Sequence, residues 1–266
     1  MIYKSLLSII ITLLVIIVLT TYLISYVNDE TSRALTLENT YLLSINVFKQ
    51  LNNTLPQILH NDACQVIVNP MNYSCNALAE NLTNTLNDTL NTISNGTGYA
   101  VRYEIINYEI YGKDNETVYS AIIQATTQSN NIRGTVVVTY PFNLCYYAQV
   151  INGIASGMKT NVTIQANNIT EAVRDINRYL AGKVNHEPNN INITLYYVGV
   201  FQMIRQAHNY TVYKGTIDYT LYASPSIRLC NVVTVINGNF HVVVLINMFV
   251  NNTYYFTVNG IINNEQ

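Results

Sequence analysis

The sequence predicts an α+β fold in which one long N-terminal helix leads into a region of antiparallel β-sheet. Three observations support this prediction. A charge-free apolar run opens the chain, apolar residues then recur every three or four positions, and alternating apolar and polar residues fill much of the remainder. The first two patterns are typical of membrane-spanning and amphipathic helices, and the third is typical of half-buried strands.

The apolar run is long enough to cross a membrane. No charged residue lies between Lys4 and Asp29, and 15 of the 22 residues from Leu6 to Val27 are Leu, Ile or Val. As a helix this run measures about 33 Å, against about 30 Å for the hydrocarbon core of a bilayer. It is longer than the apolar core of a secretory signal, and residues 20–30 contain no site of the A-x-A type. We therefore expect a membrane span.

Helical periodicity continues beyond this span. Apolar residues lie on one predicted helix face at Ala34, Leu37, Tyr41, Ile45, Phe48, Leu51 and Leu55. Pro56 disfavours the helical conformation at Leu55, so we expect the pattern to end about there. Residues 1–62 are accordingly expected to form a transmembrane helix that becomes amphipathic.

These N-terminal residues resemble those of archaeal type IV pilin-like surface proteins, which carry a class III signal peptide. The resemblance covers about residues 1–60 and rests on a short basic leader before an unbroken apolar helix that becomes amphipathic. It implies cleavage on the cytoplasmic side, with Lys4 before the cut, Ser5 at the cut and Leu6 opening the mature chain. Ile10 stands where bacterial pilins carry a Glu. An uncleaved signal anchor is the alternative interpretation.

The remainder of the chain is rich in Asn-x-Ser/Thr sequons, which occur about twice as often as the Asn, Ser and Thr content would give by chance. The candidate glycosylation sites are Asn52, Asn72, Asn81, Asn87, Asn95, Asn115, Asn161, Asn168, Asn192, Asn209 and Asn251. On the predicted helix near residues 76–95, the sequons fall away from the apolar face, where a glycan can be accommodated. We expect the N-terminus to lie inside the cell and the region after the span to lie outside it.

Cysteine usage supports an exported chain. The four cysteines are an even number and are expected to form disulfide bonds, for which three pairings exist. We favour Cys64–Cys75, which would close a loop containing Pro70, together with Cys145–Cys230; free structural thiols are the alternative. The sequence has no C-x-x-C pair and its His residues do not cluster near the cysteines, so a zinc site is not expected.

The charge content is low. Charged residues make up 11% of the chain, against about 25% in a typical protein. Few carboxylates suit an acidic habitat, because a carboxylate that is stabilised as a charge loses that contribution when it is protonated. We therefore hypothesise a hot, acidic archaeal environment, in which the melting temperature would stay high at pH 3.

Two similar modules are expected outside the membrane, at residues 63–150 and 151–266, each with one helix followed by a meander of strands; the alternative is that their similarity is an accident of alternating patterns. The first has a helix over 76–94 that stops at Gly96 and strands over 99–111, 117–127 and 134–140. In the second, Asn168 would cap a helix with Glu171 completing the cap. Its strands are expected over 191–204, 210–223, 232–236, 240–250 and 254–258, with Asn237-Gly238 as the turn of a hairpin.

No known catalytic pattern is present. His60, His186, His208 and His241 are scattered, and the sequence lacks H-E-x-x-H, G-x-S-x-G and a phosphate-binding glycine loop. We expect His241 to be an ordinary strand residue, and Asp218 and Glu104 to face solvent. The 13 basic residues are spread thinly, which disfavours nucleic-acid binding. Neither an enzyme nor a cofactor or metal site is therefore expected.

Tyrosines are concentrated in the predicted strands. Two interpretations apply: they present aromatic faces to sugars or surfaces, as adhesins do, or they are half-buried residues that favour strands. The residues concerned are Tyr196, Tyr197, Tyr210, Tyr213, Tyr219, Tyr222, Tyr254 and Tyr255.

Taken together, the patterns favour a membrane-anchored, glycosylated cell-surface structural protein. Its expected partners are membrane lipid and copies of itself, which would pack through the N-terminal helix as in a pilin-like subunit or minor pilin. The alternatives are an uncleaved signal-anchor glycoprotein, such as an adhesin, an envelope protein or a viral component, and a tethered extracellular binding domain or enzyme.

Overall fold

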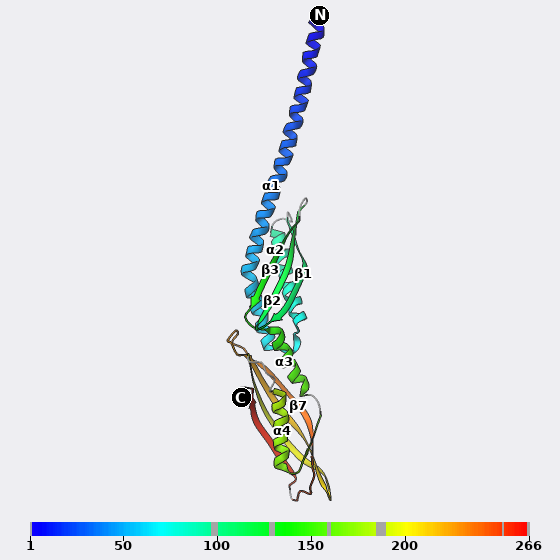
Figure 1. The fold of residues 1–266 in the computed structure, drawn as a ribbon, viewed down its shortest axis with the longest axis vertical. Helices are drawn as coiled ribbons and strands as arrows, with labels where there is room; N and C mark the ends of the chain where they lie inside the picture. The colour runs from blue at the N-terminus through cyan, green and yellow to red at the C-terminus, as the bar shows by residue number, and fades with distance from the viewer. Residues whose placement is uncertain are drawn as a thin grey trace. The chain divides into compact units, whose positions relative to one another are not determined.

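The computed structural model describes residues 2–96, 101–127, 131–158, 161–184, 190–251 and 253–264, with side chains from residue 11 onward. The predicted α+β class is confirmed, with a long N-terminal apolar helix followed by mainly antiparallel sheets (Figure 1). The helices and strands in chain order are α1 (Ile2–Val68), the 3-10 turn η1 (Pro70–Asn72), α2 (Cys75–Gly96), β1 (Arg102–Lys113), β2 (Glu116–Thr126), β3 (Asn131–Tyr140), α3 (Leu144–Gly157), β4 (Val162–Ala166), α4 (Ile169–Val184), β5 (Ile191–Ala207), β6 (Tyr210–Pro225), β7 (Thr234–Ile246) and β8 (Tyr255–Asn263).

The chain divides into two compact units. The first comprises residues 1–53, 87–106 and 122–136, and the second comprises residues 54–86, 107–121 and 137–266. Helices α1 and α2 and the three-stranded sheet β1-β2-β3 contribute residues to both units. The domain boundaries expected at residues 62 and 150 stay a prediction.

The first unit has a small core around the middle of α1. Val47 and Leu51 of α1 are buried, as are Val101, Tyr103 and Val136. The ring of Phe48 lies so close to Gly134 of β3 that a Cβ on this glycine would come within 2.5 Å of the ring. A residue without a side chain is therefore required at this point of β3.

Helix α1 does not end near Leu55, contrary to expectation, but passes through Pro56 to Val68. Pro56 removes only the hydrogen bond to the carbonyl of Asn52, and both residues are solvent-exposed, so water can satisfy this group. The buried stripe meanwhile continues without a break at spacings of three and four. It consists of Leu51, Leu55, Leu59, Ala63, Val66 and Ile67, each no more than 1% exposed. Burial of this stripe outweighs the local preference of proline.

A five-stranded sheet dominates the second unit, with the strand order β4-β7-β6-β5-β8. Strands β5, β6 and β7 form the predicted antiparallel meander, and β8 returns along the outer side of β5. The short strand β4 was not predicted and pairs in parallel with β7, so that Val162 lies opposite Val242. Helix α3 was also not predicted, although Asn143 caps it by accepting a hydrogen bond of 3.0 Å from the Tyr146 amide.

Helix α4 covers one face of this sheet (Figure 1). Its cap forms as predicted, since the Glu171 amide donates to the Asn168 side chain over 2.8 Å. The Glu171 carboxylate accepts a hydrogen bond from the Asn167 amide, which lowers the pKa of this carboxyl group. On the sheet side, the Tyr197 hydroxyl donates to Asn177 over 2.7 Å. Alternate residues of β5, such as Tyr197, therefore point to α4, while Tyr196 and Val198 point to the open face.

The predicted hairpin at Asn237-Gly238 is wrong, because β7 runs through both residues as a single strand. Gly238 lies opposite Tyr219 of β6, and a Cβ at this glycine would approach the Tyr219 hydroxyl to 2.5 Å. Asn237 accepts a hydrogen bond of 2.8 Å from Thr220. The glycine thus makes room for a neighbouring ring, as glycines inside strands often do, and does not form a turn.

Two disulfide bonds are present, but the favoured pairing is wrong. The structure joins Cys64 to Cys230 and Cys75 to Cys145, with sequence separations of 166 and 70 residues. The extension of α1 to Val68 explains the difference, because Cys64 lies inside the helix and not at the start of a loop that Cys75 could close. Both bonds lie within the second unit.

Candidate membrane and assembly surface on α1

The membrane-spanning candidate is the first part of α1. Its large apolar side chains from Ile11 to Val27 are all at least half exposed. The helix that contains them is long and apolar enough to cross a membrane. The hydroxyl groups of Thr20 and Thr21 donate to backbone carbonyls three and four residues earlier, for example to Ile17 over 2.9 and 2.8 Å. These side chains therefore need no water, which is the condition for polar groups inside a bilayer.

A polar collar follows the apolar segment. It consists of Asn28, Asp29, Glu30 and Arg33, all exposed. Asp29 and Arg33 form an ion pair of 3.1 Å one helical turn apart. Such an exposed pair contributes little stability, but the charges mark where a membrane-embedded segment would have to end.

The next part of α1 has an inverted distribution of polarity. Thr40 and Ser44 are buried, at 4% and 0% exposure, and their hydroxyls donate to carbonyls of the helix itself over 2.8 Å. Leu37, Tyr41 and Ile45, three members of the predicted apolar face, are instead 49%, 54% and 42% exposed. We call Leu37, Tyr41 and Ile45 the apolar stripe.

The apolar stripe is unusual for a helix that meets only water. A helix on the surface of a soluble domain normally buries its apolar face and exposes its polar face. Leu37, Tyr41 and Ile45 follow one another at a spacing of four residues and so form a contiguous surface, while Leu35, Leu42 and Leu43 are exposed on other sides of the same segment. Contiguous exposed apolar surface is typical of contact sites with other proteins or with membranes.

The predicted leader residues Lys4, Ser5 and Leu6 belong to α1, but their side chains lie outside the described residues. Cleavage at this position stays a prediction.

The structure describes all eleven sequon asparagines. Ten of the eleven asparagines are exposed, and Asn87 is half-buried. Their placement is compatible with glycosylation, which also stays a prediction.

One histidine lies beside a disulfide, contrary to the expectation that none would. His60 is one helical turn before Cys64, and its Nε2 atom is 3.8 Å from the Cys64 sulfur. The Tyr140 hydroxyl is 3.4 Å from His60 Nδ1, and burial raises the pKa of Tyr140 to about 12. His60 and the sulfurs of Cys64 and Cys230 lie within 4.8 Å of one another. Because both sulfurs belong to the disulfide, neither can serve as a thiolate ligand.

Of the remaining candidates, Asp218 and His241 line one shallow hollow on the five-stranded sheet. His241 is an exposed strand residue with its Nδ1 atom 3.1 Å from the Thr216 hydroxyl, while Asp218 and Glu104 are exposed, as predicted. His208 lies at the β5–β6 turn, and His186 lies outside the described residues.

The strand tyrosines differ in exposure, with Tyr210 intermediate, and contact of the exposed ones with sugars or surfaces stays a prediction. Tyr197, Tyr213 and Tyr219 are buried. Tyr196, Tyr222, Tyr254 and Tyr255 are at least 41% exposed.

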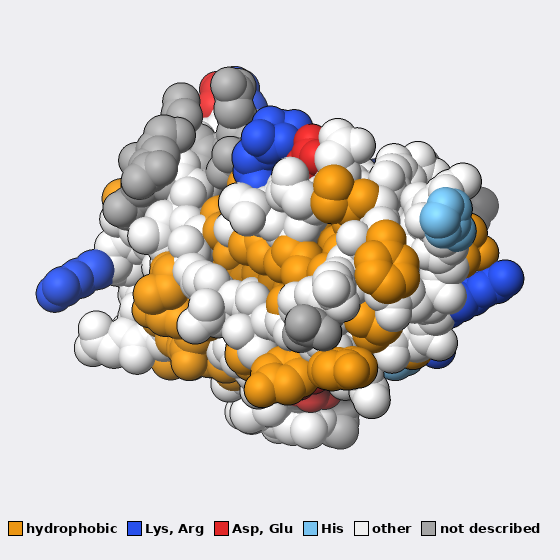
Figure 2. All heavy atoms as spheres, turned by 90° about the horizontal axis from the view of Figure 1, so that it is seen from below, with side chains coloured by type: hydrophobic (Ala, Val, Ile, Leu, Met, Phe, Trp, Pro, Cys, Tyr) orange, Lys and Arg blue, Asp and Glu red, His pale blue; other side chains and the backbone are white. Residues whose placement is uncertain are grey.

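Exposed apolar side chains also gather at the β7–β8 connection. Met248, Phe249 and Tyr254 are 48%, 54% and 72% exposed. The connection is held to β5 and β6 by hydrogen bonds such as that from the Tyr213 hydroxyl to the Thr253 carbonyl, over 2.7 Å. Figure 2 looks onto the end of the second unit where this connection lies and shows hydrophobic side chains with few charges among them.

Comparisons with known proteins identify no family. No protein-family model matches the chain, and no curated protein matches its sequence. One solved structure, described as "C-terminal motor and motor homology domain of Kar3Vik1 fused to a synthetic heterodimeric coiled coil", aligns with a TM-score of 0.16 and 8% identity over 88% of this chain and 76% of that chain. A likeness this weak carries no information about fold or function.

Proposed function

We propose that this protein is a membrane-anchored, glycosylated cell-surface structural subunit that assembles through lateral packing of α1, in the manner of a type IV pilin-like protein. The observation that carries the proposal is the inverted polarity of α1. The helix buries Thr40 and Ser44 within its own unit and leaves Leu37, Tyr41 and Ile45 uncovered. A second copy of the same helix is the partner that matches this surface.

Continuity with the membrane segment favours a second copy over another partner. Exposed apolar side chains extend from Ile11 to Val27 and reappear at Leu35, just past the polar collar. Helices that leave the membrane side by side would therefore bring their apolar stripes together. Burying the exposed half of each stripe side chain would contribute about 1 kcal/mol, so repetition along a helix and over many subunits would be needed for a stable assembly.

Two features support an extracellular position for the second unit. Disulfide bonds persist mainly in oxidising compartments outside the cytosol, and all four cysteines are paired. The eleven sequons lie after the polar collar and are mostly exposed, where an attached glycan would meet solvent. We accordingly assign the N-terminus to the cytoplasmic side and the role to structure and not to catalysis, in line with the archaeal surface proteins that residues 1–60 resemble.

The first residue of the native protein distinguishes a cleaved subunit of an assembly from an uncleaved, signal-anchored glycoprotein. Mass spectrometry of protein isolated from its own membrane, combined with electron microscopy of the cell surface, should find Leu6 as the first residue and filaments that contain the chain. An intact Met1 on a protein that detergent extracts only as a monomer would identify a single signal-anchored glycoprotein and would remove the assembly proposal.

A further inference from the structure

The open face of the five-stranded sheet contains a hollow that the proposed structural role does not use. Its volume is about 790 Å³, within the range of ligand sites in proteins. Four strands form its floor, through residues whose side chains point away from α4. These residues are Tyr196 and Val198 of β5, Asp218 and Thr220 of β6, Asn237 and Asn239 of β7, and Asn259 and Ile261 of β8.

Strand register arranges these side chains in two neighbouring rows across the sheet. Tyr196 pairs with Thr220 on one side and Ile261 on the other. Val198 pairs in the same way with Asp218 and Asn259, and the asparagines of β7 complete both rows. With strands about 4.8 Å apart, each row of four extends about 14 Å. The hollow is thus long enough for a short linear chain molecule.

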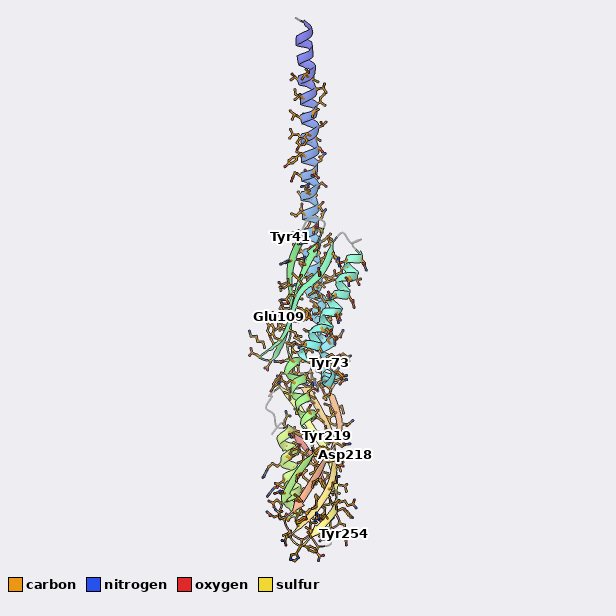
Figure 3. The ribbon with its side chains drawn as sticks, turned by 90° about the vertical axis from the view of Figure 1, so that its right-hand side faces the viewer. Tyr41, Tyr73, Glu109, Asp218, Tyr219 and Tyr254 are labelled. Atoms are coloured by element: carbon orange, nitrogen blue, oxygen red, sulfur yellow. A yellow bond between two sulfur atoms is a disulfide. The ribbon has the colours of Figure 1, made fainter. Side chains whose placement is uncertain are left out.

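The chemistry of the floor combines apolar surface with neutral hydrogen-bonding groups. Tyr196, Val198 and Ile261 are 45%, 50% and 59% exposed. Tyr196 also packs edge to face against Tyr222, with ring centroids 5.6 Å apart, which holds its ring in position. Figure 3 labels Asp218 beside Tyr219 on β6; Asp218 belongs to the open face, whereas Tyr219 is buried on the α4 side.

Asp218 is the single charged residue among those that line the hollow. A phosphate, a nucleic acid or an acidic polymer would require cationic groups, and the neighbouring lysine, Lys214, lies in an adjoining hollow. Three carboxamides, one carboxylate and the hydroxyls of Thr220 and Tyr196 suit a ligand with many uncharged hydroxyl groups, because amides both donate and accept and the carboxylate accepts twice. The apolar C–H faces of pyranose rings suit Tyr196 and its apolar neighbours.

Glycosylation would not modify the asparagines that line this hollow. Asn237, Asn239 and Asn259 do not belong to sequons. The sequon asparagines of this sheet instead lie near the strand ends, at Asn192, Asn209 and Asn251. No asparagine that lines the hollow would therefore carry a glycan of its own.

We propose that the open face of the β5–β8 sheet binds a neutral oligosaccharide through Tyr196, Asp218 and the asparagines of β7 and β8. Tyr196 stacks on a sugar ring, Asp218 accepts hydrogen bonds from vicinal hydroxyls, and the carboxamides determine orientation. The site belongs to the second unit alone. It therefore does not depend on whether α1 anchors a single molecule or builds an assembly.

The test is a titration of the full-length protein in phospholipid nanodiscs, because glycoside detergents would present sugar head groups to the site. The probes are the linear hexaoses of cellulose, amylose, mannan and chitin, and binding is followed by calorimetry and by saturation transfer from protein to sugar-ring protons. We expect at least one probe to bind saturably, in the millimolar range or tighter.

Matched variants locate the binding. Tyr196→Ala and Asp218→Asn should each weaken the affinity about tenfold, whereas Tyr196→Phe, which keeps the ring, should stay within about twofold of the unchanged protein. Tyr255→Ala and Asp88→Asn, at exposed positions outside the hollow, are the controls and should have no effect. The proposal is overturned if no hexaose binds, or if Tyr196→Ala and Asp218→Asn bind as tightly as the controls.

Discussion

At the scale of single residues, Asp62 has an unfavourable environment for a carboxylate. One of its carboxylate oxygens is buried without a hydrogen-bond partner among the described residues. Burial disfavours the charged form and raises the pKa of this side chain above its usual 3.8. The folded chain therefore holds the Asp62 proton at pH values where the unfolded chain has released it. Asp62 therefore destabilises the fold least in acid. The free energy of unfolding falls as the pH rises from the pKa of Asp62 in the unfolded chain through its raised pKa in the folded chain.

Replacing this carboxyl group removes that cost. Asp62→Asn should raise the melting temperature at pH 7 by about 1 to 3 °C, a small effect because Asp62 is partly exposed, and should leave it unchanged at pH 3. Thermal unfolding of the full chain at both pH values measures the difference, with the exposed Asp88→Asn as the matched control. A variant that is less stable at pH 7 than at pH 3, relative to the parent, would contradict this explanation.

Residue-level prediction succeeded where the signal was local. Asn168 caps α4 as predicted, because the capping side chain and its amide are only three residues apart. It failed where partners are distant in the chain. Tyr196 and Tyr222 lie 26 residues apart, and only the register of β5 on β6 brings their rings together. The position of His60 four residues before Cys64 on a helix was a signal that could have placed them together.

At the scale of elements, β7 shows how tertiary packing overrides turn chemistry. Asn-Gly is a strong hairpin signal, yet here the glycine accommodates the Tyr219 ring, which is 6% exposed. Pro56 is a similar case, because the buried stripe of α1 continues on both sides of it. Such features depend on neighbours that are far away in the sequence.

Two glycines provide a matched pair for this explanation. Gly238→Ala should destabilise the protein by about 1 to 3 kcal/mol, because the new methyl group overlaps the Tyr219 ring. Gly153→Ala lies inside α3 with nothing within 4 Å of the added Cβ, and should stabilise by about 0.5 to 1 kcal/mol. Denaturant unfolding measures both. Equal effects of the two substitutions, or a Gly238→Ala variant as stable as the unchanged protein, would show that Gly238 does not lie against the Tyr219 ring.

Helix α3 was missed although its pattern is visible in retrospect. Leu144, Tyr147, Ala148, Ile151 and Ile154 are buried at helical spacing after the Asn143 cap. Its residues cross the boundary predicted between the two modules at residue 150, and no helix or strand was expected there. Strand β4 is only five residues long and owes its position to parallel pairing with β7, which no local pattern indicates.

At the scale of the whole molecule, the disulfides join segments that the chain order keeps far apart. The Cys75–Cys145 bond ties the start of α2 to the start of α3, and the Cys64–Cys230 bond ties the end of α1 to the β6–β7 connection. Long closed loops restrict the unfolded chain strongly, so each bond is worth about 4 to 5 kcal/mol in the chain-entropy account.

Removing one bond at a time tests this pairing. Cys75→Ala with Cys145→Ala should lower the free energy of unfolding by about 2 to 5 kcal/mol and leave the other bond intact. Cys64→Ala with Cys230→Ala is the parallel test of the other bond and should lower the free energy of unfolding by a similar amount. Non-reducing peptide mapping of the parent should find Cys64–Cys230 and Cys75–Cys145. Peptides linked through Cys64–Cys75 would contradict the structure directly.

Whether the protein is a single anchored molecule or a subunit of an assembly depends on what covers the apolar stripe. A single-anchored glycoprotein would leave Leu37, Tyr41 and Ile45 in water, at a cost that polar residues would avoid. A subunit of an assembly would bury them against neighbouring copies of α1. The exposed polar residue Asn39 lies on another side of the same helix segment and offers a direct comparison.

Cysteine cross-linking in the native membrane is the most direct measurement of this claim. All four natural cysteines are paired, so Tyr41→Cys introduces one free thiol on the apolar stripe, and Asn39→Cys introduces one away from it. Mild oxidation should convert most of the Tyr41→Cys protein into covalent dimers while Asn39→Cys stays largely monomeric on a non-reducing gel. No dimers from Tyr41→Cys, or equal yields from both positions, would contradict assembly through the stripe.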